Sequence, residues 1–218
     1  MPDTVTLIEA RIIGSLVEKQ LTTPEYYPLT LNALVNACNQ KNNREPVMSL
    51  DEATVSNALE HLRDRNLVYV YYGSTSRVPK YKHMLPTYYE LEPGEVAIMA
   101  VLMLRGPQTL GELRERTARM HEFSGLDEVQ QTLNSLTTRE DALVLRLERL
   151  AGQKDARFAH LLNGPIDLEA LAAEHPTRIA SAASANDRIT QLEADVTRLT
   201  TELRDLSNTF AEFRKQFE

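Results

Sequence analysis

The sequence predicts a mainly helical α+β fold in which one unit of three helices and two strands occurs twice. The repeat shows in two places. "LEHLRDR" at 59–65 aligns with "LNSLTTR" at 133–139, with two leucines and an arginine in register. "YKHML" at 81–85 aligns with "FAHLL" at 158–162, with an aromatic residue, a histidine and a leucine in register. Repetition at a nearly constant spacing indicates a duplicated structural unit.

Helical spacing of apolar residues predicts the helices of each unit. The first unit has this spacing over 7–18 and 29–38. A third helix is expected after Ser49 and Glu52, because this pair forms a capping box that bonds free backbone N–H groups at a helix start. The second unit repeats the order, with helices expected over 95–105, 109–120 and 126–139.

Each group of three helices is followed by two strands rich in β-branched and aromatic residues. In the first unit these are "LVYVYY" at 67–72 and "KYKHML" at 80–85, and in the second "ALVLRL" at 142–147 and "RFAHLL" at 157–162. Three helices with an appended hairpin are typical of the winged-helix fold, a helix-turn-helix variant. We therefore expect two tandem winged-helix domains, over 1–90 and 91–165.

The last part of the chain has a different pattern. An Ala-rich linker is expected over 166–187, followed by a helix over 188–218 whose apolar residues keep an unbroken heptad spacing. This spacing predicts a coiled coil that makes the protein a homo-oligomer, although the helix could instead pack on the chain's own domains. The heptad residues are Ile189, Leu192, Val196, Leu199, Leu203, Leu206, Phe210, Phe213 and Phe217.

Composition points to a soluble cytoplasmic protein. The chain has 218 residues, a net charge of −7 and one cysteine, Cys38, which allows no internal disulfide. The N-terminus lacks the basic start and the following apolar block that are typical of a signal peptide. No apolar run approaches the ~20 residues needed to cross a membrane.

One long stretch carries a family resemblance. "RIIGSLVEKQLTTPEYYPLTLNALVNACNQKNNREPVMSLDE" at 11–52 resembles the opening signature of the YceH family of uncharacterised bacterial proteins, and "MLRGPQTLGELRERTARMHEF" at 103–123 is similar to a further family motif. The resemblance extends over essentially the whole chain. It implies a pair of winged-helix domains, and it implies no activity, ligand or partner.

The first hairpin carries the strongest signal for DNA binding. From Arg65 to Tyr89 the chain has no acidic residue, so its lysines and arginines form a local basic patch within an acidic protein. We expect contacts with double-stranded DNA from this hairpin, from the polar run before the third helix, and from an asparagine that can pair with adenine. The candidate residues are Lys41, Arg44, Asn57, Arg77, Lys80 and Lys82.

A protein-interaction module without DNA affinity is the alternative. Winged helices also bind proteins, and the third helix exposes acidic residues such as Glu60 and Asp64, which would repel phosphates. The polar run from Asn39 to Arg44 fits either function. It is expected to be a solvated turn closed by its asparagines, in which Arg44 pairs with Glu45 or Asp51.

No enzyme signature is present in the sequence. The five histidines include no pair at i and i+4, and there is no Gly-rich phosphate loop or nucleophile elbow. We therefore predict no catalytic residue, no metal site and no cofactor. His83 and His160 occupy equivalent places in the two closing strands and are expected to be structural.

Overall fold

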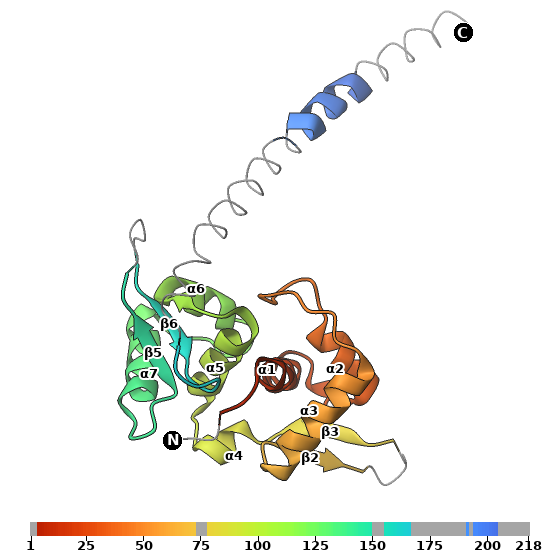
Figure 1. Ribbon diagram of the computed structural model, residues 1–218. Helices are drawn as coiled ribbons and strands as arrows, with labels where there is room; N and C mark the ends of the chain where they lie inside the picture. Colours follow the sequence, from red (N-terminus) through yellow and green to blue (C-terminus); the bar gives the residue numbers. More distant parts are fainter. Residues whose placement is uncertain (1–3, 73–77, 150–154, 167–190, 192–193, 205–218) are drawn as a thin grey trace, which may run out of the picture. The chain divides into compact units, whose positions relative to one another are not determined.

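The computed structural model describes residues 4–72, 78–149, 155–166, 191 and 194–204 (Figure 1). Residues up to 166 belong to one compact unit, and residues 167–218 form a second unit that is described by itself. The first unit is a mixed α+β structure with two small antiparallel sheets, which confirms the predicted class.

The two halves of the first unit show the same order of elements. The first half contains α1 (Leu7–Thr22), η1 (Pro24–Tyr26), β1 (Leu29–Thr30), α2 (Leu31–Cys38), α3 (Glu52–Asp64), β2 (Val68–Tyr71) and β3 (Lys80–His83). The second half contains α5 (Pro93–Arg105), β4 (Gln108–Thr109), α6 (Leu110–Thr117), α7 (Leu126–Thr138), β5 (Val144–Leu147) and β6 (Arg157–His160). Between them lies the short helix α4 (Leu85–Tyr89), which the sequence did not predict and whose first residue is the last one of the predicted strand 80–85.

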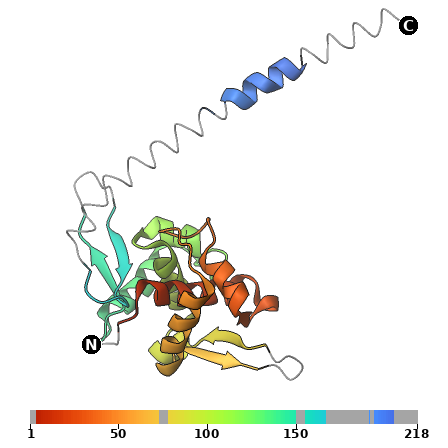
Figure 2. The same ribbon diagram turned by 45° about the vertical axis from the view of Figure 1, so that its right-hand side comes forward.

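Each half contains a three-stranded antiparallel sheet with the same topology. The strand orders are β1-β3-β2 and β4-β6-β5, so the hairpin predicted in each unit gains a third, short strand. The registers are also equivalent, because Val68 lies opposite His83 and Val144 lies opposite His160. The hairpins lie on different sides of the helical centre (Figure 2).

The start of α3 differs from the expectation. The capping residue is Asp51, whose Oδ1 accepts a hydrogen bond from the backbone N–H of Thr54 at 2.7 Å. The predicted capping box of Ser49 and Glu52 is therefore wrong, because Glu52 is already the first residue of the helix. A carboxylate can accept a hydrogen bond from this N–H just as a hydroxyl can, and the sequence contains both Asp51 and Ser49 before the helix.

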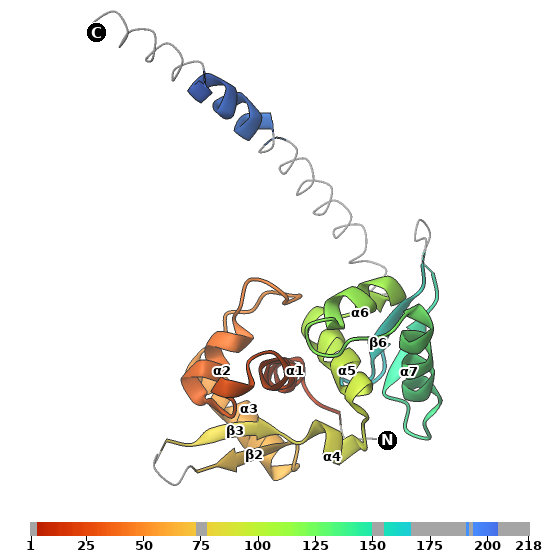
Figure 3. The ribbon, with the colours of Figure 1, turned by 180° about the vertical axis from the view of Figure 1, so that it is seen from behind.

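Helices α1 and α5 form the centre of the unit, and this explains why both are buried on nearly every side. In Figures 1 and 3, α1 lies between α2 and α5. Residues 9–17 of α1 and 94–104 of α5 are buried without interruption. The buried apolar side chains of both halves consequently form one continuous cluster.

Gly14 allows these two helices to approach closely. A Cβ atom at this position would lie 3.0 Å from Cγ of Leu104 and 3.1 Å from Cβ of Met103. The halves are joined a second time at the ends of the unit, because the N–H of Val5 donates to the carbonyl of Leu162 at 2.7 Å.

The described part of the C-terminal segment is helical. Within 194–204, the heptad residues Val196, Leu199 and Leu203 are 63%, 52% and 69% exposed. The other heptad residues, Ile189, Leu192, Leu206, Phe210, Phe213 and Phe217, lie outside the described residues, as does nearly all of the predicted linker. Among the described residues, no helix is long and apolar enough to cross a membrane.

We predict that Gly14→Val lowers the free energy of unfolding by about 1–3 kcal/mol, because the added carbons would overpack the α1–α5 contact. The matched control is Gly111→Val in α6, where a Cβ would meet no atom within 4 Å. Urea denaturation should show a change within about 0.5 kcal/mol for this control. Equal effects of the two substitutions would mean that α1 and α5 do not depend on a close approach at Gly14.

Candidate nucleic-acid interface

The outer face of the β2–β3 hairpin brings lysines and tyrosines together. In the antiparallel register, Tyr69 lies opposite Lys82 and Tyr71 lies opposite Lys80. Residues directly opposite each other project from the same side of a sheet, and so do residues two apart along a strand. The hairpin therefore presents two cross-strand Tyr–Lys pairs on one face, which we call the Tyr–Lys face (Tyr69, Tyr71, Lys80 and Lys82).

Side-chain exposure agrees with this arrangement. Tyr69 is 55% and Tyr71 is 46% exposed, and Tyr72, which directly follows β2, is 67% exposed. The Nζ atom of Lys82 lies 5.4 Å from the centroid of the Tyr69 ring, which is the geometry of a cation–π contact. Two cations thus stand beside exposed aromatic rings, a combination suited to phosphates and to the faces of bases or sugars.

The opposite face of the hairpin is anchored in the core. Val68 and His83 are buried, and the backbone N–H of His83 donates to the Tyr27 hydroxyl at 2.8 Å. A ring nitrogen of His83 also contacts the side-chain oxygen of Gln20 in α1. Burial, and secondarily the charge of Lys82, lowers the pKa of His83 to about 4, so the ring is neutral at physiological pH.

The equivalent face in the second half has a different chemistry. There Leu145 lies opposite Ala159, and Leu147 lies opposite Arg157. Arg157 is the only cation among these four residues, and it pairs with Glu112 at 2.8 Å. Both halves share the sheet register, but the second hairpin offers neither the aromatic rings nor an uncommitted cation on this face.

The other predicted DNA contacts lie in several places. Asn57 is exposed on α3, and Lys41 is exposed on the loop between α2 and α3. Arg77 lies outside the described residues. The hairpin thus combines two of the six candidates, Lys80 and Lys82, on the same face.

Arg44 has a structural role instead of an exposed one. Its side chain is fully buried, and its guanidinium binds both carboxylate oxygens of Glu18, at 3.2 and 2.6 Å. It also donates to the carbonyl of Ala37 and to the side chain of Gln40. The expected pairing with Glu45 or Asp51 is therefore wrong, and Arg44 cannot reach a phosphate without leaving these partners.

A second buried arginine holds the same loop. Arg11 in α1 donates to the carbonyls of Cys38 and Pro46, at 3.2 and 2.7 Å. Asn39 closes the loop by exchanging two 2.7 Å hydrogen bonds with the backbone of Leu50. The polar run is therefore a connection closed by Asn39, with arginine anchors that the sequence did not reveal.

The two equivalent histidines do not form a joint site. His83 and His160 lie in different sheets, and burial also lowers the pKa of His160 to about 4. In the part of the chain that the structure describes, no three His, Cys, Asp or Glu side chains gather as they would around a metal ion. Cys38 is buried on α2.

The first unit is an α+β structure built from two structurally equivalent halves, and comparison with other proteins identifies the family of the chain. Residues 5–153 match a family described as "Protein of unknown function, DUF480". The chain is 48% identical to a UPF0502 protein of Geobacter sulfurreducens over 97% of both chains. It is 51% identical to a UPF0502 protein of Opitutus terrae over 88% of this chain and 81% of the other.

A UPF0502 protein of Pelobacter propionicus is also similar, with 49% identity over 96% of both chains. The protein therefore belongs to the DUF480/UPF0502 family, and the predicted resemblance to a family of uncharacterised bacterial proteins is confirmed.

The Tyr–Lys face was only half visible in the sequence. The lack of acidic residues points to its lysines, but strand propensity alone accounts for Tyr69 and Tyr71 in the sequence. The alternation of valine and tyrosine in "VYVY" at 68–71 was the available signal. It showed that the tyrosines share one face, and only the register with β3 places the lysines beside them.

We predict that the stability of the protein falls as the pH drops from 6.5 towards 4. A histidine in an unfolded chain has a pKa of about 6.5. In this window the histidine is therefore protonated in the unfolded state, whereas buried His83 stays neutral in the folded state. The stabilisation is fully present above pH 6.5. At pH 4.5, His83 alone is expected to account for a loss of about 2–3 kcal/mol.

Urea denaturation at a series of pH values measures this loss. His83→Gln should make the unfolding free energy less dependent on pH between 6.5 and 4, and the dependence that remains should include the contribution of His160, whose pKa is lowered in the same way. A slope as steep as that of the unchanged protein would show that His83 is not the group responsible.

Proposed function

We propose that the protein is a non-enzymatic DNA-binding protein in which the Tyr–Lys face makes the main contact with the duplex. The observation that carries this proposal is the pairing of Lys80 and Lys82 with exposed Tyr71 and Tyr69 on one side of a rigidly anchored hairpin. Lysines at this position can neutralise phosphates, and the tyrosines can contact the sugars and phosphates beside them.

The order of elements supports the assignment of each half to the winged-helix fold. A helix, a short strand, two further helices and a hairpin follow one another, and the short strand joins the hairpin as its third member. In winged helices that bind DNA, the third helix enters the major groove and the hairpin contacts the backbone. In the first half these elements are α3, with Asn57 exposed, and β2–β3.

The distribution of charge favours the first half over the second. The acidic residues of α3, such as Glu60 and Asp64, disfavour deep insertion of that helix between two phosphate backbones. The hairpin has no such residue from Arg65 to Tyr89. We therefore propose binding led by the hairpin, with Lys41 and Arg77 as additional contacts and with no contribution from Arg44.

Fluorescence anisotropy with mixed-sequence duplex DNA across a salt series tests this function. Each phosphate contact contributes about −0.9 to the slope of log affinity against log salt. Lys80→Ala and Lys82→Ala should each weaken binding at low salt and reduce the magnitude of the slope by about 1. Arg114→Ala, which removes an exposed cation of α6, is the matched control and should leave both quantities unchanged.

Flat anisotropy at low salt would contradict DNA binding and would favour the alternative, a protein-interaction module. Equal losses for Lys82→Ala and Arg114→Ala would contradict the assignment of the site, because they would show that only net charge matters.

We further propose that the C-terminal helix joins copies of the chain through a coiled coil. Val196, Leu199 and Leu203 follow the heptad spacing and are at least half exposed in the described segment. Burying such a stripe against a second copy removes apolar surface from water. A dimer would present two hairpins to one duplex, an arrangement that suits a cytoplasmic transcriptional regulator with two half-sites.

The oligomer is tested by measuring the mass in solution with light scattering on the full chain. We expect the unchanged protein to have a multiple of the single-chain mass, and the double variant Leu199→Asp, Leu203→Asp to have the single-chain mass. Thr200→Asp adds a charge to the same helix outside the heptad stripe and should preserve the oligomer. A single-chain mass for the unchanged protein would contradict the coiled coil.

A further inference from the structure

A polar cleft lies between the two halves of the first unit, away from the hairpins. It consists of two adjoining cavities of about 340 and 220 Å³. Glu18, Thr22, Asn43 and Arg119 line both cavities, so the two are parts of one cleft. The first half contributes the C-terminal part of α1 and the loop 39–51, and the second half contributes α5, α6 and the turn after α6.

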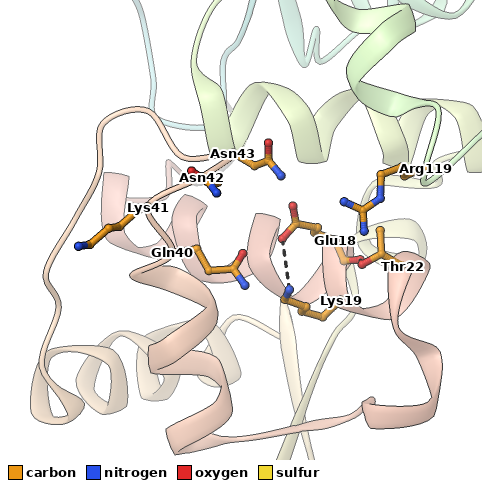
Figure 4. A pocket seen from close by; sticks show the side chains of 8 residues that line it. All are labelled: Glu18, Lys19, Thr22, Gln40, Lys41, Asn42, Asn43 and Arg119. Carbon is orange, nitrogen blue, oxygen red and sulfur yellow. Dashed lines mark hydrogen bonds and ion pairs between the residues drawn. The ribbon is translucent and has the colours of Figure 1, made fainter. Parts of the chain in front are cut away.

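The cleft contains an excess of positive charge once its internal ion pairs are considered. Glu18 is the acidic group at its centre (Figure 4), and both of its oxygens are held by buried Arg44. The remaining lining cations are Lys19, Lys41, Arg105, Arg116 and Arg119. Glu115 is the other acidic residue that lines the cleft.

Two of these cations are partly engaged by the protein. Lys19 is 4.0 Å from Glu18, which Arg44 already neutralises. Arg116 is 3.6 Å from Glu112, but that carboxylate also pairs with Arg157 at 2.8 Å. Both carboxylates are already paired with another arginine. Lys19 on the wall of the first half and Arg116 on the wall of the second half therefore keep positive charge that is not neutralised.

Arg119 faces the cleft without a partner of its own. Among the described residues it makes no hydrogen bond or ion pair, and Figure 4 shows its guanidinium directed towards Glu18 and Thr22. Lys41, on the opposite rim, points away from the cavity (Figure 4). Arg119 is therefore the cation best placed to bind a molecule that enters.

Arg105, like Arg119, comes from the second half, and it connects the two walls. Its guanidinium donates to the side-chain oxygen of Asn43, which has a left-handed backbone conformation (φ 61°) that points it towards α5. Burial, and next the nearby charge of Arg116, lowers the pKa of Arg105. A bound anion would relieve this crowding of like charges.

We propose that this cleft binds a small polyanion, a compound with a phosphate group or several carboxylates, held between the two halves. Arg119, Arg105, Arg116 and Lys19 supply the charge, and the side-chain amide of Asn42 supplies a neutral hydrogen-bond donor. The larger cavity alone falls within the usual size range of small-molecule sites, about 300–1,000 Å³. Guanidinium groups suit such ligands because they donate two parallel hydrogen bonds to phosphate or carboxylate.

The cleft is also lined by residues from both sequence stretches that resemble family motifs, 11–52 and 103–123. Glu18 to Asn43 fall within the stretch 11–52, and Arg105 to Met120 fall within the stretch 103–123. The Tyr–Lys face uses neither stretch. The proposed ligand site gives these two segments a common function, and it is independent of whether the hairpin binds DNA.

Isothermal titration calorimetry and thermal unfolding of the full chain test the site, with pyrophosphate and citrate as probes at constant ionic strength. A ligand that binds the folded state raises the melting temperature in proportion to the logarithm of its concentration. We expect saturable binding of at least one probe to the unchanged protein. Arg119→Gln should weaken it by about tenfold or more, because a charge-assisted hydrogen bond is lost.

The control is Arg114→Gln, which removes an exposed cation of α6 that does not line the cleft. It should bind the probe as tightly as the unchanged protein does. No saturable binding of either probe, or equal weakening by Arg114→Gln and Arg119→Gln, would overturn the proposal.

Nucleic acid is the other possible source of phosphate, and competition distinguishes it. We expect duplex DNA not to displace the probe, and Arg119→Gln not to change the anisotropy of labelled DNA. Displacement of the probe by DNA, together with loss of DNA binding in Arg119→Gln, would show that the cleft binds a nucleic-acid backbone and would overturn the small-ligand proposal.

Discussion

The close approach of α1 and α5 is the constraint on which the rest of the first unit depends. Each helix is the first long helix of its half, and each is buried on nearly every side because the other half covers it. Gly14 makes this contact possible, since a side chain there would meet Leu104 and Met103. The two halves therefore share one apolar core, and displacement of one helix would expose both.

Two buried arginines, Arg44 and Arg11, hold the loop 39–51 in place beside this centre. Arg44 and Glu18 form a pair whose desolvation is offset only because Arg44 makes several further hydrogen bonds. Arg11 makes two more, one with the carbonyl of Cys38 at the end of α2 and one with the carbonyl of Pro46 in the loop. These contacts hold the loop 39–51 against α1 and bring it to α5, where the N–H of Glu45 donates to the carbonyl of Leu104 at 2.8 Å. The cleft between the halves has its shape because this loop cannot move freely.

The two hairpins show how a duplicated fold acquires different surfaces. Their registers are equivalent, and each turns a valine and a histidine inward at the same position. The opposite face is less constrained by packing, although Ala159 of the second hairpin is buried, so its chemistry is free to differ. The first hairpin has lysines and tyrosines there, and the second has leucines, an alanine and an arginine held by Glu112. The proposed DNA contact and the proposed anion site thus occupy separate parts of one scaffold.

The sequence by itself determined the elements whose signal is local. Periodicity and β-branched runs predicted the helices and both hairpins, and the repeat predicted that His83 and His160 are equivalent, because these features depend on neighbouring residues. Long-range contacts were decided only by the tertiary structure. Arg44 lies 26 residues from Glu18, so nothing local revealed that it is buried. The packing of α1 on α5 likewise joins distant segments and forms the cleft. The register of β2 with β3 is a short-range contact, but the strand patterns leave it open, and it is what forms the Tyr–Lys face.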